Sequence, residues 1–139
     1  MAKGVLTVIT VCTDPAREEE YNRWYLHTHL PDLSKAKGFV KARRFRNLDA
    51  TGPRRFLALY EFESPSIKES YKELLKLAMK AADTGRHISF MAPAANTGGG
   101  LWEEMEPQSF KPLEKHGYPT DTEYLRDLRK RVQGQIETL

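Results

Sequence analysis

The sequence has a single cysteine, Cys12, and no hydrophobic run long enough to cross a membrane. One cysteine excludes an internal disulfide and a thiolate-rich zinc site, and it is typical of a reducing compartment. Residues 1–11 contain one lysine and a short apolar run, and they lack the small-residue cleavage site of a signal peptide. We therefore expect a cytoplasmic protein without a membrane partner, and we expect residues 4–12 to form a buried strand.

The chain also lacks a strong charge of one sign. Its 22 basic residues are opposed by 19 acidic ones, which leaves a formal net charge of +3. The densest basic stretches, 43–46 and 126–131, are not interleaved with the aromatic residues that stack on bases. We expect no nucleic-acid partner.

The 139 residues are 40% hydrophobic, which is enough for the core of one domain. The elements predicted over residues 1–106 are a strand at 4–12, a helix at 15–30, strands at 39–47 and 56–63, a helix that starts at Ser64-Pro65 and runs to about residue 83, and a strand at 101–106. Pro31 should end or kink the first helix, and 85–100 is predicted as a loop. The order β-α-β-β-α-β predicts an α+β, ferredoxin-like domain, an antiparallel sheet with both helices on one face.

Residues 107–139 are predicted as a C-terminal extension. Three prolines within 107–119 indicate an extended arm. Thr120 and Glu123 have the spacing of a capping box, and an apolar stripe follows on a predicted helix. We expect this extension to pack on the same domain or on a partner subunit.

The sheet predicts a homodimer. Strands 4–12 and 56–63 carry apolar residues on both alternating sets, so the face without helices would expose a large apolar patch. A second copy packing sheet against sheet would bury it and form a dimeric α/β barrel, although the C-terminal extension could cover the same face.

A histidine is predicted on the buried side of the first helix. At about 100° per residue, one broad sector contains Tyr21, Tyr25, Leu26, His29, Leu30 and Leu33. His29 therefore lies near the middle of the apolar face.

Three stretches carry a resemblance to a known family. They are YNRWYLHTHLPDL at 21–33, GFVKARRF at 38–45 and LALYEFESP at 57–65. This pattern, spanning roughly residues 3–106, resembles the EthD-like branch of the dimeric α/β-barrel superfamily. The resemblance implies the ferredoxin-like dimeric fold and a small organic ligand held between sheet and helices, while the superfamily's reactions range from cyclisation and dehydration to cofactor-free oxygenation and haem degradation.

His29 matches the histidine of the EthD-like pattern and is the main catalytic candidate. An imidazole titrates near neutral pH and can move protons to and from a carbon beside a carbonyl. Tyr25, one turn earlier, and Asn22, two turns earlier, could hold the imidazole or a substrate oxygen. The alternative is a helix-end histidine bonded to a carbonyl or to Asp32. The catalytic hypothesis requires the ring to face inward beside a hollow that admits an organic molecule.

The candidate substrate-binding residues are Trp24, Arg43 and Tyr60. Trp24 is a pocket wall or a core residue, and Tyr60 could donate its hydroxyl to a developing enolate oxygen. Arg43 and Arg44 point to opposite sheet faces, and the sequence leaves open which one is buried. A buried guanidinium needs a carboxylate, either Glu61 or one brought by the substrate.

The candidates include no metal site and require no cofactor. His27 and His29 lie about 160° apart on a helix and do not share a ligand set. The first hypothesis is a cofactor-independent enzyme that dehydrates, cyclises or isomerises a small hydrophobic carbonyl or phenolic compound. The alternatives are a cofactor-free oxygenase of phenols and a non-catalytic protein that binds a small molecule.

Overall fold

The computed structural model describes residues 1–49, 51–94, 99–106 and 122–139. The chain divides into two compact units, Met1–Glu106 and Pro107–Leu139. Within the described residues, no helix is both long and apolar enough to cross a membrane.

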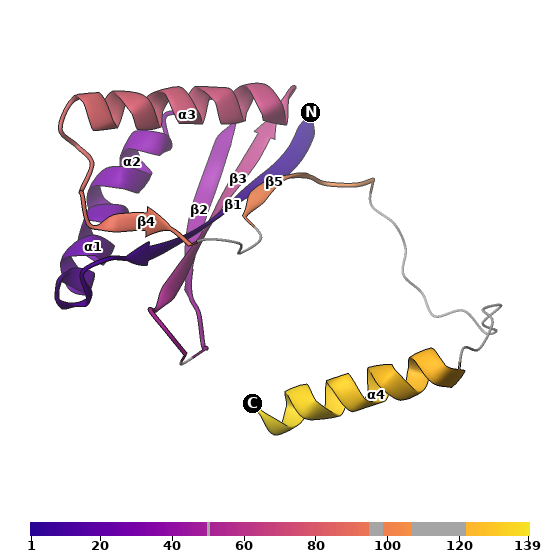
Figure 1. The fold of residues 1–139 in the computed structure, drawn as a ribbon. Coiled ribbons are helices and arrows are strands. Elements are labelled where there is room, and N and C mark those ends of the chain that lie inside the picture. Colours follow the sequence, from indigo (N-terminus) through magenta and orange to yellow (C-terminus); the bar gives the residue numbers. More distant parts are fainter. Residues whose placement is uncertain (50, 95–98, 107–121) are drawn as a thin grey trace. The chain divides into compact units, whose positions relative to one another are not determined.

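The first unit is built on an antiparallel sheet (Figure 1). Its strands run in the order β2-β3-β1-β4, and β5 also pairs with β1. The strands are β1 (Ala2–Cys12), β2 (Phe39–Arg46), β3 (Arg55–Ser64), β4 (Met91–Pro93) and β5 (Gly100–Glu103).

The edge beside β1 is formed by two short strands. β4 pairs with Thr10–Cys12, and β5 pairs with Gly4–Thr7. The prediction of 85–100 as a loop was therefore wrong at Met91–Pro93. Three residues are too few to show a strand's alternation, and the proline is tolerated because this is an edge strand.

The first helical segment passes through four consecutive pieces. They are η1 (Pro15–Arg17), α1 (Glu18–Trp24), the π-helical turn η2 (Tyr25–His29) and α2 (Leu30–Leu33). The Asp14 carboxylate caps the start by accepting from the Ala16 backbone N–H. The helix does not end at Leu30, the first of the two outcomes predicted from Pro31, because α2 continues to Leu33. Pro31 lies in the first turn of α2, where the missing N–H breaks no α-helical bond.

The second helix of this unit, α3 (Ile67–Asp83), ends at the predicted residue but begins after Ser66 rather than at the predicted Ser64-Pro65, because Ser64 still belongs to β3. Ser66 caps it by accepting from the Glu69 backbone N–H. In the second unit, α4 spans Thr122–Glu137. The predicted capping residue Thr120 and the predicted arm at 107–119 lie outside the described residues.

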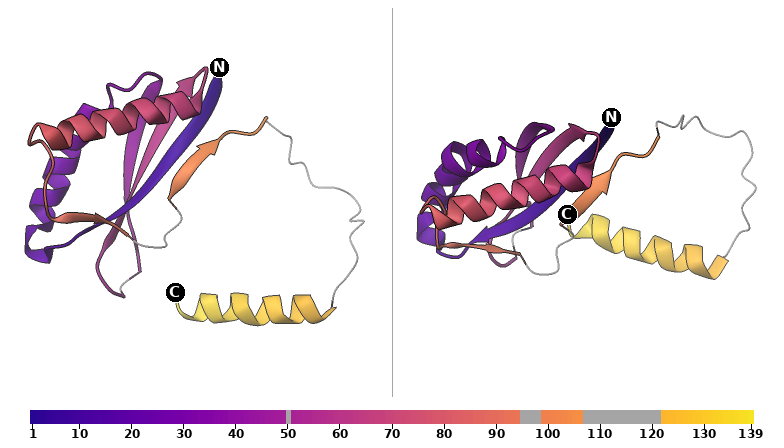
Figure 2. Two further views of the ribbon diagram at one scale, coloured as in Figure 1. Left: turned by 45° about the horizontal axis from the view of Figure 1, so that its top comes forward. Right: turned by 90° about the horizontal axis from the view of Figure 1, so that it is seen from above.

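The first helical segment and α3 pack on the same face of the sheet (Figure 2). The core that they share joins the helix residues Tyr21, Tyr25, Leu33, Ile67 and Leu74 to the strand residues Leu6, Phe56, Ala58, Tyr60 and Phe62. Gly38 begins the return to β2 with φ of +84°, and a Cβ there would lie 2.6 Å from the Ser64 Cβ. Only glycine fits this turn. The predicted α+β, ferredoxin-like β-α-β-β-α-β fold is confirmed, with its last strand split in two.

We call the other side of the sheet the open face. Strand register places Leu57 and Leu59 there, opposite Ile9 and Thr7 of β1. Phe45 and Trp102, at the two sides of the sheet, are 43% and 56% exposed. The apolar second face predicted from the sequence is therefore present.

Candidate functional site

The π-helical turn aligns one row of buried side chains at a spacing of four residues. Tyr21, Tyr25, His29 and Leu33 are all buried. In a regular α-helix such a row would drift steadily around the axis, because four residues exceed one turn. The wider π turn at Tyr25–His29 reverses the drift for one step. The same change leaves Leu26 55% exposed, so the prediction that it shares the buried sector was wrong.

His29 lies in a cluster of aromatic rings. Its ring is stacked on Trp24, with centroids 4.6 Å apart and planes at 22°. The rings of Tyr25 and His87 meet it edge-on, at centroid distances of 4.9 Å and 5.8 Å. We call Trp24, Tyr25, His29 and His87 the aromatic cluster. Only 8% of His29 is exposed, as its place on the helix predicts.

Burial makes His29 a neutral imidazole. It lowers the pKa of His29 to about 4, the positive charge of His87 acts in the same direction, and Asp32 opposes them. The described residues offer the ring no hydrogen bond. Asp32, the partner considered from the sequence, accepts instead from Arg86 at 2.8 Å and 3.1 Å. At neutral pH the ring can therefore accept a proton but has none to give beyond its single N–H.

Two buried tyrosines lie behind this ring. Their hydroxyl oxygens are 3.1 Å apart and share a hydrogen bond. Burial raises the pKa of Tyr25 to about 12, and it raises the pKa of Tyr60 as well. Both remain protonated at neutral pH, and one of the two O–H groups is the donor of the bond that they share. Tyr60 reaches the cluster only through Tyr25.

The structure resolves which arginine is buried. Arg43 lies on the open face, with its Nε 3.8 Å from a carboxylate oxygen of Glu61. It is thus on the opposite side of the sheet from His29, and the structure does not bring these two predicted site residues together. Arg44 lies on the helix side instead, with its guanidinium carbon 4.1 Å from the Tyr25 ring centroid. Alternation along β2 separates the two arginines but gives no sign of which face the helices cover.

Asn22 is engaged by this arginine. Its Oδ1 accepts a hydrogen bond of 2.8 Å from Nη1 of Arg44. Asn22 therefore positions Arg44, whereas the sequence suggested that it holds the imidazole or a substrate oxygen.

Trp24 and His87 form the outer wall of the aromatic cluster. The Trp24 indole N–H donates to the Arg86 carbonyl at 2.9 Å. The ring centroids of Trp24 and His87 are 5.0 Å apart. His87 was missed from the sequence, because it lies in a segment predicted as loop and no periodicity links it to the first helix.

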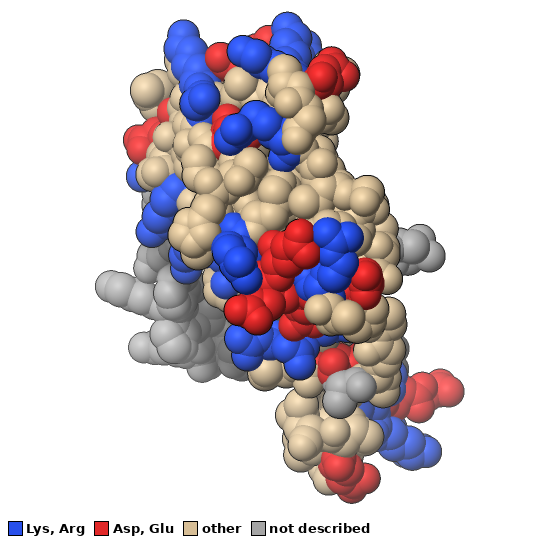
Figure 3. All heavy atoms as spheres, turned by 90° about the vertical axis from the view of Figure 1, so that its left-hand side faces the viewer, with Lys and Arg blue, Asp and Glu red and all other residues tan. Residues whose placement is uncertain are grey.

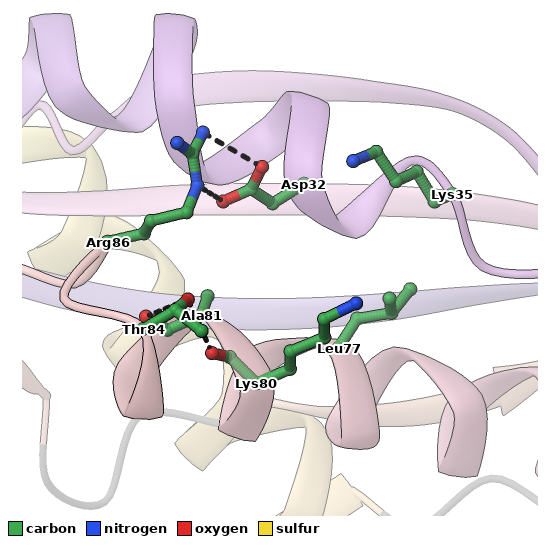
Figure 4. A pocket seen from close by; sticks show the side chains of 7 residues that line it. All are labelled: Asp32, Lys35, Leu77, Lys80, Ala81, Thr84 and Arg86. Atoms are coloured by element: carbon green, nitrogen blue, oxygen red, sulfur yellow. Dashed lines mark hydrogen bonds and ion pairs between the residues drawn. The ribbon is translucent and has the colours of Figure 1, made fainter.

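A hollow of about 360 Å³ lies between α2 and α3 (Figure 4). The Asp32–Arg86 ion pair lines it, together with Lys35, Leu77, Lys80, Ala81 and Thr84. His29 lines neither this hollow, nor the one on the open face, nor the one on α4. None of these three hollows is therefore the one beside His29 that the catalytic hypothesis requires. The rings of Trp24 and His87 occupy the space against the imidazole.

The outer surface near α1 carries mixed charge. Arg17 pairs with Glu20, Arg23 with Glu19 and Arg54 with Glu18. Acidic and basic side chains accordingly lie next to one another on the side drawn in Figure 3. Over the described part of the chain, no three His, Cys, Asp or Glu side chains converge as a metal site would require.

No protein-family model matches the chain, and no curated protein matches it. Several solved structures are similar to the chain. An EthD family protein from Bacillus halodurans is 16% identical, with 76% of this chain and 100% of that chain covered and a TM-score of 0.43. A variant of SnoaB, a cofactor-independent oxygenase from Streptomyces nogalater, is 16% identical, with 82% and 98% covered and a TM-score of 0.45.

A monooxygenase from Streptomyces coelicolor, solved in complex with nanaomycin D, is also similar. It is 13% identical, with 79% of this chain and 93% of that chain covered and a TM-score of 0.43. The similar structures thus include a protein of the EthD family, the family whose sequence pattern this chain resembles. At these identities and scores they do not determine the chemistry of this chain.

Proposed function

We propose that the chain is a cofactor-independent enzyme that acts on a small, largely apolar carbonyl or phenolic compound, with His29 as the general base. The observation that carries the proposal is a buried imidazole held neutral among aromatic rings. A neutral imidazole in such surroundings can take a proton from an organic molecule that packs against the same rings.

The low basicity of His29 restricts the substrate. A base with a pKa near 4 removes protons at a useful rate only from groups that are already acidic. Carbons between a carbonyl and an aromatic ring, and phenols conjugated with a carbonyl, meet this condition. Such a substrate also accepts the electron pair itself, so the step requires no cofactor.

The proton transfer accounts for every bond, proton and electron pair without a cofactor. The C–H bond of the substrate breaks, its proton moves to the free ring nitrogen of His29, and its electron pair moves to the carbonyl oxygen as an enolate. The imidazolium then returns the proton to another carbon in an isomerisation or cyclisation, or to a departing hydroxyl group in a dehydration. A protonated tyrosine such as Tyr25 supplies the hydrogen bond that stabilises the enolate.

We propose that the substrate reaches His29 by displacing His87. The His87 side chain is exposed and meets His29 and Trp24 edge-on. A flat aromatic compound could replace this ring and make the same contacts. The closed state of the cluster is then the state without substrate.

The probe 1,8-dihydroxyanthrone tests the proposal, because it has phenolic hydroxyls and a CH₂ group made acidic by two flanking aromatic rings that are conjugated with its carbonyl. Under argon in D₂O, we expect the protein to accelerate deuterium exchange at the CH₂ group above the buffer rate, as followed by NMR. His29→Gln should remove the acceleration. His27→Gln, which changes an exposed histidine on the same turn, should preserve it.

The same probe in air separates the alternatives. Protein-dependent oxygen uptake that requires His29 would support the phenol oxygenase. Binding without exchange and without oxygen uptake would support the non-catalytic protein. Equal exchange rates for the wild type and His29→Gln would refute the proposed role of His29.

A further inference from the structure

Two arginines in this structure bind a carboxylate through the edge of the guanidinium that carries Nε and Nη2. Arg86 donates from Nε and Nη2 to the two oxygens of Asp32, at 2.8 Å and 3.1 Å. Arg17 donates from the same two atoms to Glu20, at 2.9 Å and 3.0 Å. The two N–H groups on this edge are parallel, which matches the spacing of the two oxygens of a carboxylate.

Arg44 has the same edge buried and unused. Its Nε and Nη2 are both inaccessible to solvent and have no hydrogen-bond partner among the described residues. The remaining terminal nitrogen, Nη1, donates to Asn22. The two free donors are thus the pair that binds Asp32 in Arg86 and Glu20 in Arg17.

The aromatic surroundings of Arg44 do not replace a carboxylate. The guanidinium carbon lies 4.1 Å from the ring centroid of Tyr25, 5.2 Å from that of Phe56 and 5.4 Å from that of Tyr21. Ring faces attract the positive charge. They accept no hydrogen bond in the plane of the guanidinium, where the Nε and Nη2 protons lie. The Tyr21 hydroxyl is close enough for Arg44 to lower the pKa of Tyr21. This hydroxyl is neutral and already bonded to Thr10, so it does not balance the charge of Arg44.

The nearby carboxylates are committed elsewhere. Glu18 pairs with Arg54 at 2.9 Å. Glu61 lies on the open face near Lys41 and Arg43. Burying a guanidinium without its counter-ion is costly, so this arrangement suits a site that receives the counter-ion from a ligand.

We infer that Arg44 is the receptor for a carboxylate group of the ligand, which makes the ligand class an aromatic or polyketide-like acid. This inference rests on the proposed function, because it assigns a substrate to the same site. The Tyr25 ring lies between the two groups, in contact with both His29 and Arg44. A ligand that covers Tyr25 can place its carboxylate at Arg44 and its acidic carbon at His29. Since both nitrogens are covered, its binding must displace neighbouring side chains.

The test compares 2-naphthoate with 2-naphthamide, a neutral compound of nearly the same shape, by isothermal titration calorimetry on the full chain. A charged, bidentate hydrogen bond predicts that the carboxylate binds about 10- to 100-fold more tightly than the amide. Arg44→Met should abolish this preference by weakening the binding of the carboxylate much more than that of the amide, whose carbonyl can accept only a single, uncharged hydrogen bond from Arg44. Arg43→Met removes the neighbouring arginine on the open face and should retain the preference.

Two further measurements separate a loss of carboxylate binding from a loss of folding. Arg44→Met should unfold at a urea midpoint no lower than that of the wild type, since it removes an unpaired buried charge. If it does not fold, Arg44→Lys keeps the charge without the parallel donors and should lose most of the preference. The inference is overturned if the wild type binds both compounds equally, or if Arg44→Met still prefers the carboxylate.

Failure of the proposed function would be distinguished from failure of this inference by the His29→Gln variant. His29→Gln should retain the preference for 2-naphthoate even though it loses deuterium exchange. A carboxylate preference that depends on Arg44, in a protein without His29-dependent exchange, would leave a carboxylate-binding site with no proton-transfer role for His29.

Discussion

At the scale of single residues, the site is defined by two buried basic side chains, neither of which has an acidic partner. His29 avoids the problem by remaining neutral, because burial disfavours its protonated form. Arg44 cannot lose its proton, so it keeps its charge against three rings and one amide oxygen. Both are thereby prepared for a ligand, His29 to accept a proton and Arg44 to receive an anion.

The lowered pKa of His29 predicts how stability depends on pH. Between about pH 6.5 and pH 4 the unfolded chain protonates this residue while the folded chain resists protonation. The free energy of unfolding should therefore be fully supported above pH 6.5 and should fall by up to about 3 kcal/mol as pH drops towards 4. Urea unfolding at pH 7.0, 5.5 and 4.5 measures this slope.

His29→Phe should flatten that slope, since phenylalanine does not titrate. His27→Phe is the matched control, because His27 is exposed on the same turn, and it should keep the wild-type slope. If both variants lose stability with pH as the wild type does, His29 is not the buried neutral group described here.

At the scale of elements, two irregular segments build the site. The π-helical turn Tyr25–His29 keeps the buried row of the first helix in line. The segment between α3 and β4 then covers this row from outside. Arg86 fixes the segment in two ways, since its side chain binds Asp32 and its carbonyl accepts from Trp24. His87 follows directly and closes the aromatic cluster.

Removing the His87 ring should therefore open the cluster. In His87→Ala, two of the three causes that lower the pKa of His29, burial and the charge of His87, are reduced, while the charge of Arg44 remains. The pKa of His29 should rise from about 4 towards its ordinary value, by about one unit or more. NMR titration of the His29 ring protons measures the shift, and the deuterium exchange of 1,8-dihydroxyanthrone should saturate at lower substrate concentration. His27→Ala should change neither quantity, and an unchanged His29 pKa in His87→Ala would show that His87 does not cover the site.

At the scale of the whole molecule, the sheet has one face under helices and one face that the first unit leaves uncovered. The open face combines aliphatic residues of β1 and β3 with Phe45 and Trp102. The Lys41–Glu61 and Arg43–Glu61 pairs give it a polar part. An apolar face of this kind is typical of a surface that associates, and we expect a homodimer formed sheet against sheet.

Leu59→Lys tests this expectation. Leu59 lies on the open face, opposite Thr7 and Arg43 in the strand register. By sedimentation equilibrium the wild type should have twice the 16.0 kDa mass of the chain, and Leu59→Lys should be shifted towards the monomer. Leu48→Lys, in the exposed connection between β2 and β3, should remain dimeric. A wild type that is monomeric at micromolar concentration would contradict the proposed assembly.

The sequence by itself determined the order of the longer helices and strands of the first unit, because each depends on local patterns. The β-branched run of β1, the capping residues Asp14 and Ser66 and the four-residue spacing of the first helix act over a few neighbouring residues. The same spacing placed His29 and Tyr25 on the buried face. These features require no knowledge of what packs against them.

Only the tertiary structure decided which partners meet in the site. His87 comes to His29 from a segment distant in sequence, Arg44 rather than Arg43 faces the helices, and Asp32 turns to Arg86. The π turn and the split edge at β4 and β5 also depend on packing. The physical reason is that alternation and helical spacing specify which residues share a face, whereas the identity of the opposing surface is set by the energy of the complete packed core.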